Sequence, residues 1–152
     1  MAERVVTLNR KAYHDYFIDE SLEAGISLTG SEIKSVRAGK VSVREAYVKP
    51  QDHELWLWNA HIAPYEAASF FQHEPRRPRR LLLHRDQISY LTSKVKEKGY
   101  TLVPLKLYFK ERGNYLKVEI GLARGKKLYD KRESIAKRDA EREMDRAAYR
   151  RR

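Results

Sequence analysis

The sequence predicts a mainly β fold with two or three helices over residues 1–124, followed by a basic segment over residues 125–152 outside the folded core. Three observations support this prediction. Apolar residues alternate with other residues at a period of two, turn-forming residues separate the alternating stretches, and the end of the chain is rich in charge and poor in large apolar side chains.

The predicted strands are recognised by their period and by the turns between them. Leu116, Val118, Ile120 and Leu122 alternate with other side chains, which is typical of a half-buried strand. Turn-like residues precede this strand and follow another, which indicates a hairpin. In chain order, the predictions are a strand over 18–28 that is interrupted or bent at Gly25, a hairpin of 41–49, 50–53 and 54–61, and a hairpin of 101–109, 111–114 and 115–122.

Two amphipathic helices are predicted between the strands. The first covers residues 31–38, and Gly39 is placed to end it with a positive φ. The second covers residues 87–98 and stops at Gly99. Both helices are expected to plug or flank a curved sheet.

Residues 73–80 are predicted to form a loop, because two prolines and four arginines disfavour a core strand. Five or six short strands with two or three helices fit a small closed β-barrel of the OB type. A β-sandwich is the alternative architecture.

The basic tail, residues 125–152, cannot support a core of its own. Residues 126–152 hold eleven Lys or Arg and six Asp or Glu. Ordering a residue costs ~1–2 kcal/mol of backbone entropy, which so few apolar side chains cannot offset. We therefore expect the tail to be disordered when free and ordered by a partner. On a helix its regularly spaced arginines would form a basic ridge opposite Met144, and a solvated helix that merely ends the chain is the alternative. The arginines of this ridge are Arg138, Arg142, Arg146 and Arg150.

Charge points to an anionic partner. The net charge of +11 is uneven, since residues 1–75 carry −3 and residues 76–152 carry +14. Ten tyrosines favour nucleic acid over a membrane surface, because aromatic rings stack on unpaired bases. No run approaches the ~18 apolar residues of a membrane span. Together with the absence of cysteine and of a secretory signal, this favours a cytoplasmic protein that does not enter membranes.

Catalytic motifs are absent from the sequence. It contains no phosphate loop, dinucleotide fingerprint or nucleophile elbow. The pair His14-Asp15 occurs in some metal-dependent phosphohydrolases, but a metal site needs three or more ligands. We therefore expect no enzyme activity, no cofactor and no metal, with a metal-dependent hydrolase as one rival hypothesis.

Basic residues outside the tail are the better functional signal. Two clusters, at residues 76–80 and 124–127, lie in the same half of the chain as the tail, and together they favour RNA or DNA binding. From charge and expected exposure, the candidate contacts are Lys34, Arg37, Arg79, Arg80, Lys126 and Lys127.

Several segments together resemble the SsrA-binding protein (SmpB) family. They begin with NRKAYHDY at residue 9 and EAGI at residue 23, continue with LTGSEIKSVRAG at residue 28, and end with GKKLYDKR at residue 125. Residues 61–65, 80–83 and 99–105 also match, so the resemblance keeps the family's order and covers nearly the whole chain.

This resemblance implies a function as well as the OB-type barrel and the tail. The family is a non-catalytic partner of transfer-messenger RNA (tmRNA) in trans-translation, the rescue of stalled ribosomes. Its barrel binds the tRNA-like part of tmRNA, and its tail enters the small-subunit decoding centre and the empty messenger path. The protein is expected to act as a monomer. A general tRNA- or ribosome-binding OB protein is the rival reading.

The resemblance also implies individual site residues. On the barrel, the RNA-facing candidates are Asn9, His14, Glu23, Leu82 and Lys117. In the tail, the residues that match the family's decoding-site motif are Tyr129, Asp130, Lys131 and Arg132. Beyond Arg138 the tail resembles the family in its basic composition more than residue by residue. Met144 is the apolar residue that remains there to contact a partner.

Overall fold

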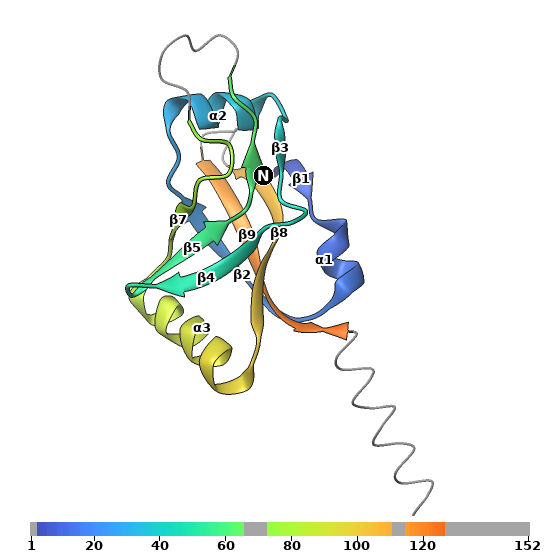
Figure 1. Ribbon diagram of the computed structural model, residues 1–152, viewed down its shortest axis with the longest axis vertical. Coiled ribbons are helices and arrows are strands. Elements are labelled where there is room, and N and C mark those ends of the chain that lie inside the picture. Colours follow the sequence, from blue (N-terminus) through green and yellow to red (C-terminus); the bar gives the residue numbers. More distant parts are fainter. Residues whose placement is uncertain (1–2, 66–72, 111–114, 127–152) are drawn as a thin grey trace, which may run out of the picture.

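The computed structural model describes residues 3–65, 73–110 and 115–126 of the chain. Within this part the protein is mainly β with three helices, as predicted (Figure 1). None of the described helices is long and apolar enough to cross a membrane. Residues 127–152, and with them most of the predicted tail, lie outside the described residues.

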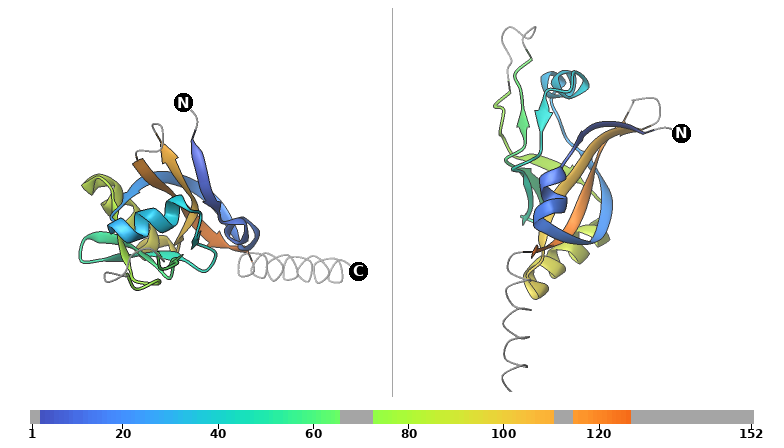
Figure 2. Two further views of the ribbon diagram at one scale, coloured as in Figure 1. Left: turned by 90° about the horizontal axis from the view of Figure 1, so that it is seen from above. Right: turned by 90° about the vertical axis from the view of Figure 1, so that its right-hand side faces the viewer.

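Seven strands form one antiparallel sheet whose pairings return to their starting point. From β8 they pass through β4, β5, β7, β2 and β9 and back to β8, while β1 pairs with the free edge of β8 (Figure 2). A separate pair, β3 and β6, joins residues near α2. The strands are β1 (Arg4–Leu8), β2 (Tyr16–Ile26), β3 (Val41–Ser42), β4 (Tyr47–Gln51), β5 (Glu54–Trp58), β6 (His61–Ile62), β7 (Arg79–Leu82), β8 (Thr101–Lys110) and β9 (Tyr115–Gly125).

Both predicted hairpins are present, with one change in extent. The β8–β9 hairpin matches its prediction, and its connection at residues 111–114 lies outside the described residues. The β4–β5 hairpin turns at Asp52 and His53, which have φ values of 51° and 62°. The longer strands predicted around it are wrong, because β3 and β6 are separate and pair with each other.

The strand β2 was predicted correctly in position but not in its irregularity. Pairing to β9 continues through Gly25, where β2 also begins to pair with β7. The shift in register lies instead between Ile18 and Glu20. The absence of a Cβ at Gly25 has another cause, since a Cβ there would lie 3.2 Å from the Cβ of Leu82.

The predicted helices form at the expected places, and a third helix was missed. Thr29 and Glu32 make a capping box for α2 (Gly30–Arg37), and Gly39 follows it with a φ of 76°. Helix α3 (Arg85–Lys98) ends at Gly99, which has a φ of 69°. The missed helix α1 (Arg10–Asp15) has six residues, too few to show a 3.6-residue period.

A buried ion cluster corrects the prediction for residues 73–80. Arg79 and Arg80 belong to β7, and the side chains of Arg79 and Glu32 are fully buried. Arg79 Nε donates to Glu32 Oε2 at 2.7 Å, and Arg77 donates to the same carboxylate. Arg79 is tolerated inside the sheet because a buried carboxylate compensates its charge, while Arg80 points to solvent.

Backbone groups satisfy the rest of the Arg79 guanidinium. Its Nη1 donates to the carbonyl of Ala60 at 2.7 Å and its Nη2 to that of Pro75 at 3.1 Å. Burial acts to raise the pKa of Glu32, but the hydrogen bonds from Arg77, from the Thr29 backbone and from Arg79 outweigh it, so the pKa lies below its ordinary value. Glu32 thus remains ionised and joins α2 to β7.

Replacing Glu32 by Gln should destabilise the protein by about 3–5 kcal/mol, because the arginines would lose the carboxylate that balances their buried charge. Because the pKa of Glu32 is lower in the folded protein than in the unfolded chain, the ionised carboxylate contributes its full stabilisation above the ordinary Glu pKa of about 4.3. This stabilisation is lost as the pH falls through the lower pKa of the folded state. Denaturant unfolding from pH 7 to pH 3 should show the gap between wild type and E32Q narrowing below about pH 4.3.

The matched control is Glu54→Gln, because Glu54 lies 4.0 Å from Arg80 in a solvent-exposed pair. It should change the unfolding free energy by less than about 0.5 kcal/mol. If E32Q lowered the unfolding free energy by less than about 1 kcal/mol, the buried ion cluster would not have the stabilising role described above.

Candidate RNA-binding face

The outward surface of strands β2, β8 and β9 brings several predicted site residues together. Because side chains alternate along a strand, Glu23 and Gly25 point away from the buried Ala24. Gly25 pairs with Lys117, which pairs on its other side with Tyr108. We call this surface, made by Glu23, Gly25, Leu82, Tyr108, Lys106, Lys110, Lys117 and Glu119, the β2/β8/β9 face.

Leu82 extends this face onto β7. It pairs directly with Gly25, and it is one of the exposed large apolar residues, with 46% of its surface accessible. Since Gly25 has no side chain, Leu82 stands over bare backbone next to Glu23 and Lys117. Three of the residues implied by the family resemblance, Glu23, Leu82 and Lys117, therefore lie on one continuous surface.

Most charges on the β2/β8/β9 face are paired. Lys110 forms an ion pair with Glu23, and Lys106 lies 3.0 Å from Glu3 and 3.6 Å from Glu119. The hydrogen bond from Lys110 holds the pKa of Glu23 below its usual value. Within the described residues Lys117 has no carboxylate within ion-pair distance. Unlike Lys106 and Lys110, it therefore carries a charge that no ion pair on this face balances.

Tyr108 is the rigid centre of the β2/β8/β9 face. Its side chain is almost fully buried, and the Nζ atoms of Lys106 and Lys110 lie 4.8 and 5.9 Å from its ring centroid. Burial raises the pKa of Tyr108, and the nearby Glu23 carboxylate raises it further, so the hydroxyl stays protonated. The lysines and Glu23 are therefore held in place before any ligand binds.

Sequence reasoning did not identify Lys106, Tyr108 and Lys110. Part of the signal was present, because Lys106 and Tyr108 are two residues apart in the strand predicted over 101–109 and so share one face, which Lys110 continues just beyond the predicted end. Their importance depends on Glu3, Glu23 and Glu119, which are distant in sequence and are brought near only by strand pairing.

Two predicted contacts are wrong in their expected exposure. Asn9 is buried: its Nδ2 donates to the carbonyls of Val43 at 3.0 Å and Pro104 at 2.8 Å, and its Oδ1 caps α1 by accepting from the Ala12 backbone at 3.1 Å. Arg79 is buried in the ion cluster. Both side chains are occupied by structural hydrogen bonds, so neither faces a ligand.

The other predicted contacts lie at the surface but apart from one another. His14 is exposed on α1, with its Nδ1 3.0 Å from an Asp15 carboxylate oxygen. Lys126, partly exposed, donates from Nζ to the carbonyl of Tyr13 at 3.1 Å. The remaining exposed ones are Lys34 and Arg37 on α2 and Arg80 on β7, while Lys127 and the predicted tail contacts Tyr129, Asp130, Lys131, Arg132, Arg138, Arg142, Met144 and Arg146 lie outside the described residues.

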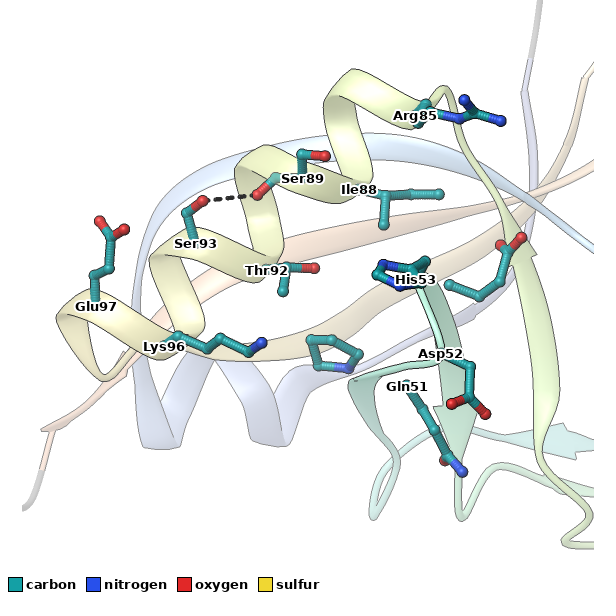
Figure 3. Close-up of a pocket in the computed structure, with 12 residues that line it drawn as sticks. Gln51, Asp52, His53, Arg85, Ile88, Ser89, Thr92, Ser93, Lys96 and Glu97 are labelled. Atoms are coloured by element: carbon teal, nitrogen blue, oxygen red, sulfur yellow. Dashed lines mark hydrogen bonds between the residues drawn. The ribbon is translucent and has the colours of Figure 1, made fainter.

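A large open groove lies elsewhere, between α3 and the β4–β5 turn (Figure 3). It has a volume of about 930 Å³, and Ser89, Thr92 and Lys96 face the turn residues across it. Its lining mixes acidic and basic side chains, and Ser93 donates to the Ser89 carbonyl at 2.9 Å. Among the described residues no group of three His, Asp or Glu side chains could hold a metal ion. Neither the lining of this groove nor the search for metal ligands indicates a catalytic centre there.

A small mainly β domain with basic side chains on the outward surface of its sheet belongs, by fold and site, with the nucleic-acid-binding proteins. The family model of the SmpB protein matches residues 6–150. The chain belongs to the SmpB family.

Individual relatives agree with this assignment. The SsrA-binding protein of Roseiflexus sp. (strain RS-1) is 63% identical over 95% of this chain and 91% of its own length. The SsrA-binding protein of Carboxydothermus hydrogenoformans is 58% identical over 95% of this chain and 96% of its own length. A solved structure described as "tmRNA-SmpB: a journey to the center of the bacterial ribosome" contains a chain that is 55% identical, covers 79% of this chain and 83% of its own, and superposes with a TM-score of 0.65.

Replacing Asn9 by Ala should lower the unfolding free energy by about 2–4 kcal/mol, because it removes a helix cap and two buried hydrogen bonds to the carbonyls of Val43 and Pro104. Chemical denaturation measures this loss. Arg10→Ala is the control, since Arg10 is exposed and neighbours the same cap, and it should stay within about 0.5 kcal/mol. A stable N9A protein that had lost only RNA affinity would contradict the structural role.

Proposed function

We propose that this protein is an RNA-binding adaptor that binds the tRNA-like part of tmRNA and delivers it to stalled ribosomes for trans-translation. The observation that carries this proposal is the β2/β8/β9 face in a member of the SmpB family, together with a 55% identical neighbour described as tmRNA-SmpB and the bacterial ribosome. The protein performs no reaction and requires no cofactor or metal.

The β2/β8/β9 face suits a folded RNA more than a bare polyanion. The carboxylate of Glu23 can accept hydrogen bonds from 2′-hydroxyls or base amino groups, while Leu82 offers apolar contact to a sugar or base. Lys117 supplies the unpaired charge for a phosphate. Because Lys110, which lies over the Tyr108 ring, holds Glu23 in position, binding requires little further ordering of this site.

The fold supports this role as one domain over residues 1–124 followed by the tail. We interpret the circular pairing from β8 back to β8 as a small closed barrel of the OB type, an architecture that binds nucleic acid on its strands. In this proposal the protein acts as a monomer in the cytoplasm, where it meets the ribosome.

The end of the domain gives the tail a fixed starting point. Arg124 makes two hydrogen bonds to Asp19, at 2.8 and 3.0 Å, and Arg124 and Lys126 lie 5.6 and 5.4 Å from the Phe17 ring. Gly125 is the last residue of β9 and Lys126 is held by these contacts, so the predicted start of the tail at residue 125 is two residues too early. In this proposal the tail that follows is disordered when free and becomes helical in the decoding centre and messenger path, with Tyr129, Asp130, Lys131 and Arg132 at the decoding site.

Single substitutions on the β2/β8/β9 face should weaken tmRNA binding without unfolding the protein. We expect K117A to reduce the affinity for the tRNA-like fragment and to lower the salt slope of log K by about 1, and L82A or E23A to reduce affinity by about tenfold with little change in slope. Filter binding at several salt concentrations measures both quantities.

Lys49→Ala is the matched control, because Lys49 is exposed on β4 and has no partner among the described residues. It should leave affinity and slope nearly unchanged. Equal binding of wild type to bulk tRNA and to the tmRNA fragment would instead favour a general tRNA-binding protein.

Deleting the residues after Asp130 should separate binding from delivery. The truncated protein should keep its melting temperature and its affinity for tmRNA, because the barrel provides both, while tagging of incomplete peptides on stalled ribosomes is lost. Thermal unfolding, filter binding and a reconstituted tagging assay measure the three properties. If truncation unfolded the barrel, the division into domain and tail would be wrong.

A further inference from the structure

We propose that Arg4 and Arg37 form a second site for RNA phosphates, on the side of β8 opposite to the β2/β8/β9 face. The site rests on the proposed function, because its ligand is also RNA, but it would bind a different stretch of RNA from the one bound by Glu23, Leu82 and Lys117. We call it the Arg4/Arg37 site.

A single buried ring holds both arginines. The guanidinium carbons of Arg4 and Arg37 lie 5.9 and 4.8 Å from the centroid of Phe109, and Arg4 Nη2 donates to the carbonyl of Arg37 at 3.1 Å. Phe109 is 1% exposed and packs with Val36 and Ile62. The two charges are therefore fixed relative to a rigid part of the core although both side chains are exposed.

These charges have no counter-ion in the part of the chain that the structure describes. Among the described residues, no carboxylate lies within ion-pair distance of Arg4 or Arg37. On the other side of β8 the corresponding lysines on Tyr108 are paired, Lys106 with Glu3 and Glu119 and Lys110 with Glu23. Two neighbouring cations without an acid repel each other, and an anion between them would turn this repulsion into attraction.

The chemistry of the site suits a phosphate. A guanidinium has five N–H donors in a planar fork that matches two phosphate oxygens, and Arg4 uses one of them on the Arg37 carbonyl. Lys34, one helical turn before Arg37, is exposed and lies 5.5 Å from the Tyr65 ring, so it extends the basic surface along α2. Spaced cations without a shaped pocket favour a run of phosphates on an RNA backbone.

The structural alternative is that Arg4 only stabilises the end of α2. A cation near the last carbonyls of a helix is favourable, and stacking on an aromatic ring adds to it. That role explains one hydrogen bond of Arg4 and does not use the charge of Arg37. It predicts a loss of stability on substitution and no change in the salt dependence of RNA binding.

The experiment compares the double variant R4Q/R37Q with wild type in two RNA-binding assays over a range of salt. The first probe is the tRNA-like fragment of tmRNA, and the second is the purified small ribosomal subunit. With the RNA that the site contacts, we expect the affinity of R4Q/R37Q to be about tenfold lower than that of wild type. The slope of log K against log salt concentration should become shallower by about 1.5. R4K/R37K keeps both charges and should retain most of the slope.

R85Q/K96Q is the matched control, since it removes two exposed charges from α3, at the other end of the molecule (Figure 1). It should leave the slope unchanged. A shallower slope with the fragment assigns the site to tmRNA, and one with the subunit assigns it to ribosomal RNA. Unchanged slopes with both probes in folded R4Q/R37Q overturn the Arg4/Arg37 site, whereas failure of wild type to bind the tmRNA fragment overturns the proposed function instead.

Discussion

The buried carboxylate of Glu32 is the interaction on which the arrangement of the functional surfaces depends. It completes the cap of α2 by accepting from the Thr29 backbone at 2.9 Å, and it binds the guanidinium of Arg79. Arg79 in turn reaches the carbonyls of Ala60 and Pro75. The pair of Glu32 and Arg79 thus joins the start of α2, the segment between β5 and β6 and the start of β7, so α2 and the sheet hold a single relative position.

The cluster specifies a register more than it adds stability. Burying charges costs free energy that their attraction offsets only with good geometry, so an apolar replacement of the whole set could be equally stable. Arg79 reaches both Glu32 and the Ala60 carbonyl only when β7 pairs with β5 as it does, with Leu81 opposite Leu55. A shift by one residue would expose Arg79 and bury Arg80 without a partner. The same register places Leu82 beside Gly25 on the β2/β8/β9 face.

Local patterns in the sequence predicted most of the fold and only part of the site. A period of two identified the β8–β9 hairpin, and the glycines at positions 39 and 99 located the ends of α2 and α3. Short α1 has too few residues for a period, and Arg79 was expected at the surface because its carboxylate partner is 47 residues away. The family resemblance supplied Glu23, Leu82 and Lys117, but not Lys110, which holds Glu23, since that contact arises from pairing between distant strands.

The period-two geometry of β8 also separates two kinds of RNA contact. Tyr108 and Phe109 are adjacent, so their rings point to opposite sides of the sheet, and each holds two cations. Carboxylates from β2 and β9 neutralise the lysines on Tyr108, which leaves hydrogen-bonding groups whose geometry can recognise the shape of a folded RNA. No carboxylate of residues 3–65, 73–110 or 115–126 pairs with the arginines on Phe109, and their charge supplies affinity without sequence information. The two sides of one strand can therefore make different contacts with RNA. Paired charges on one side favour specific hydrogen bonds, and unpaired charges on the other side favour binding to phosphates.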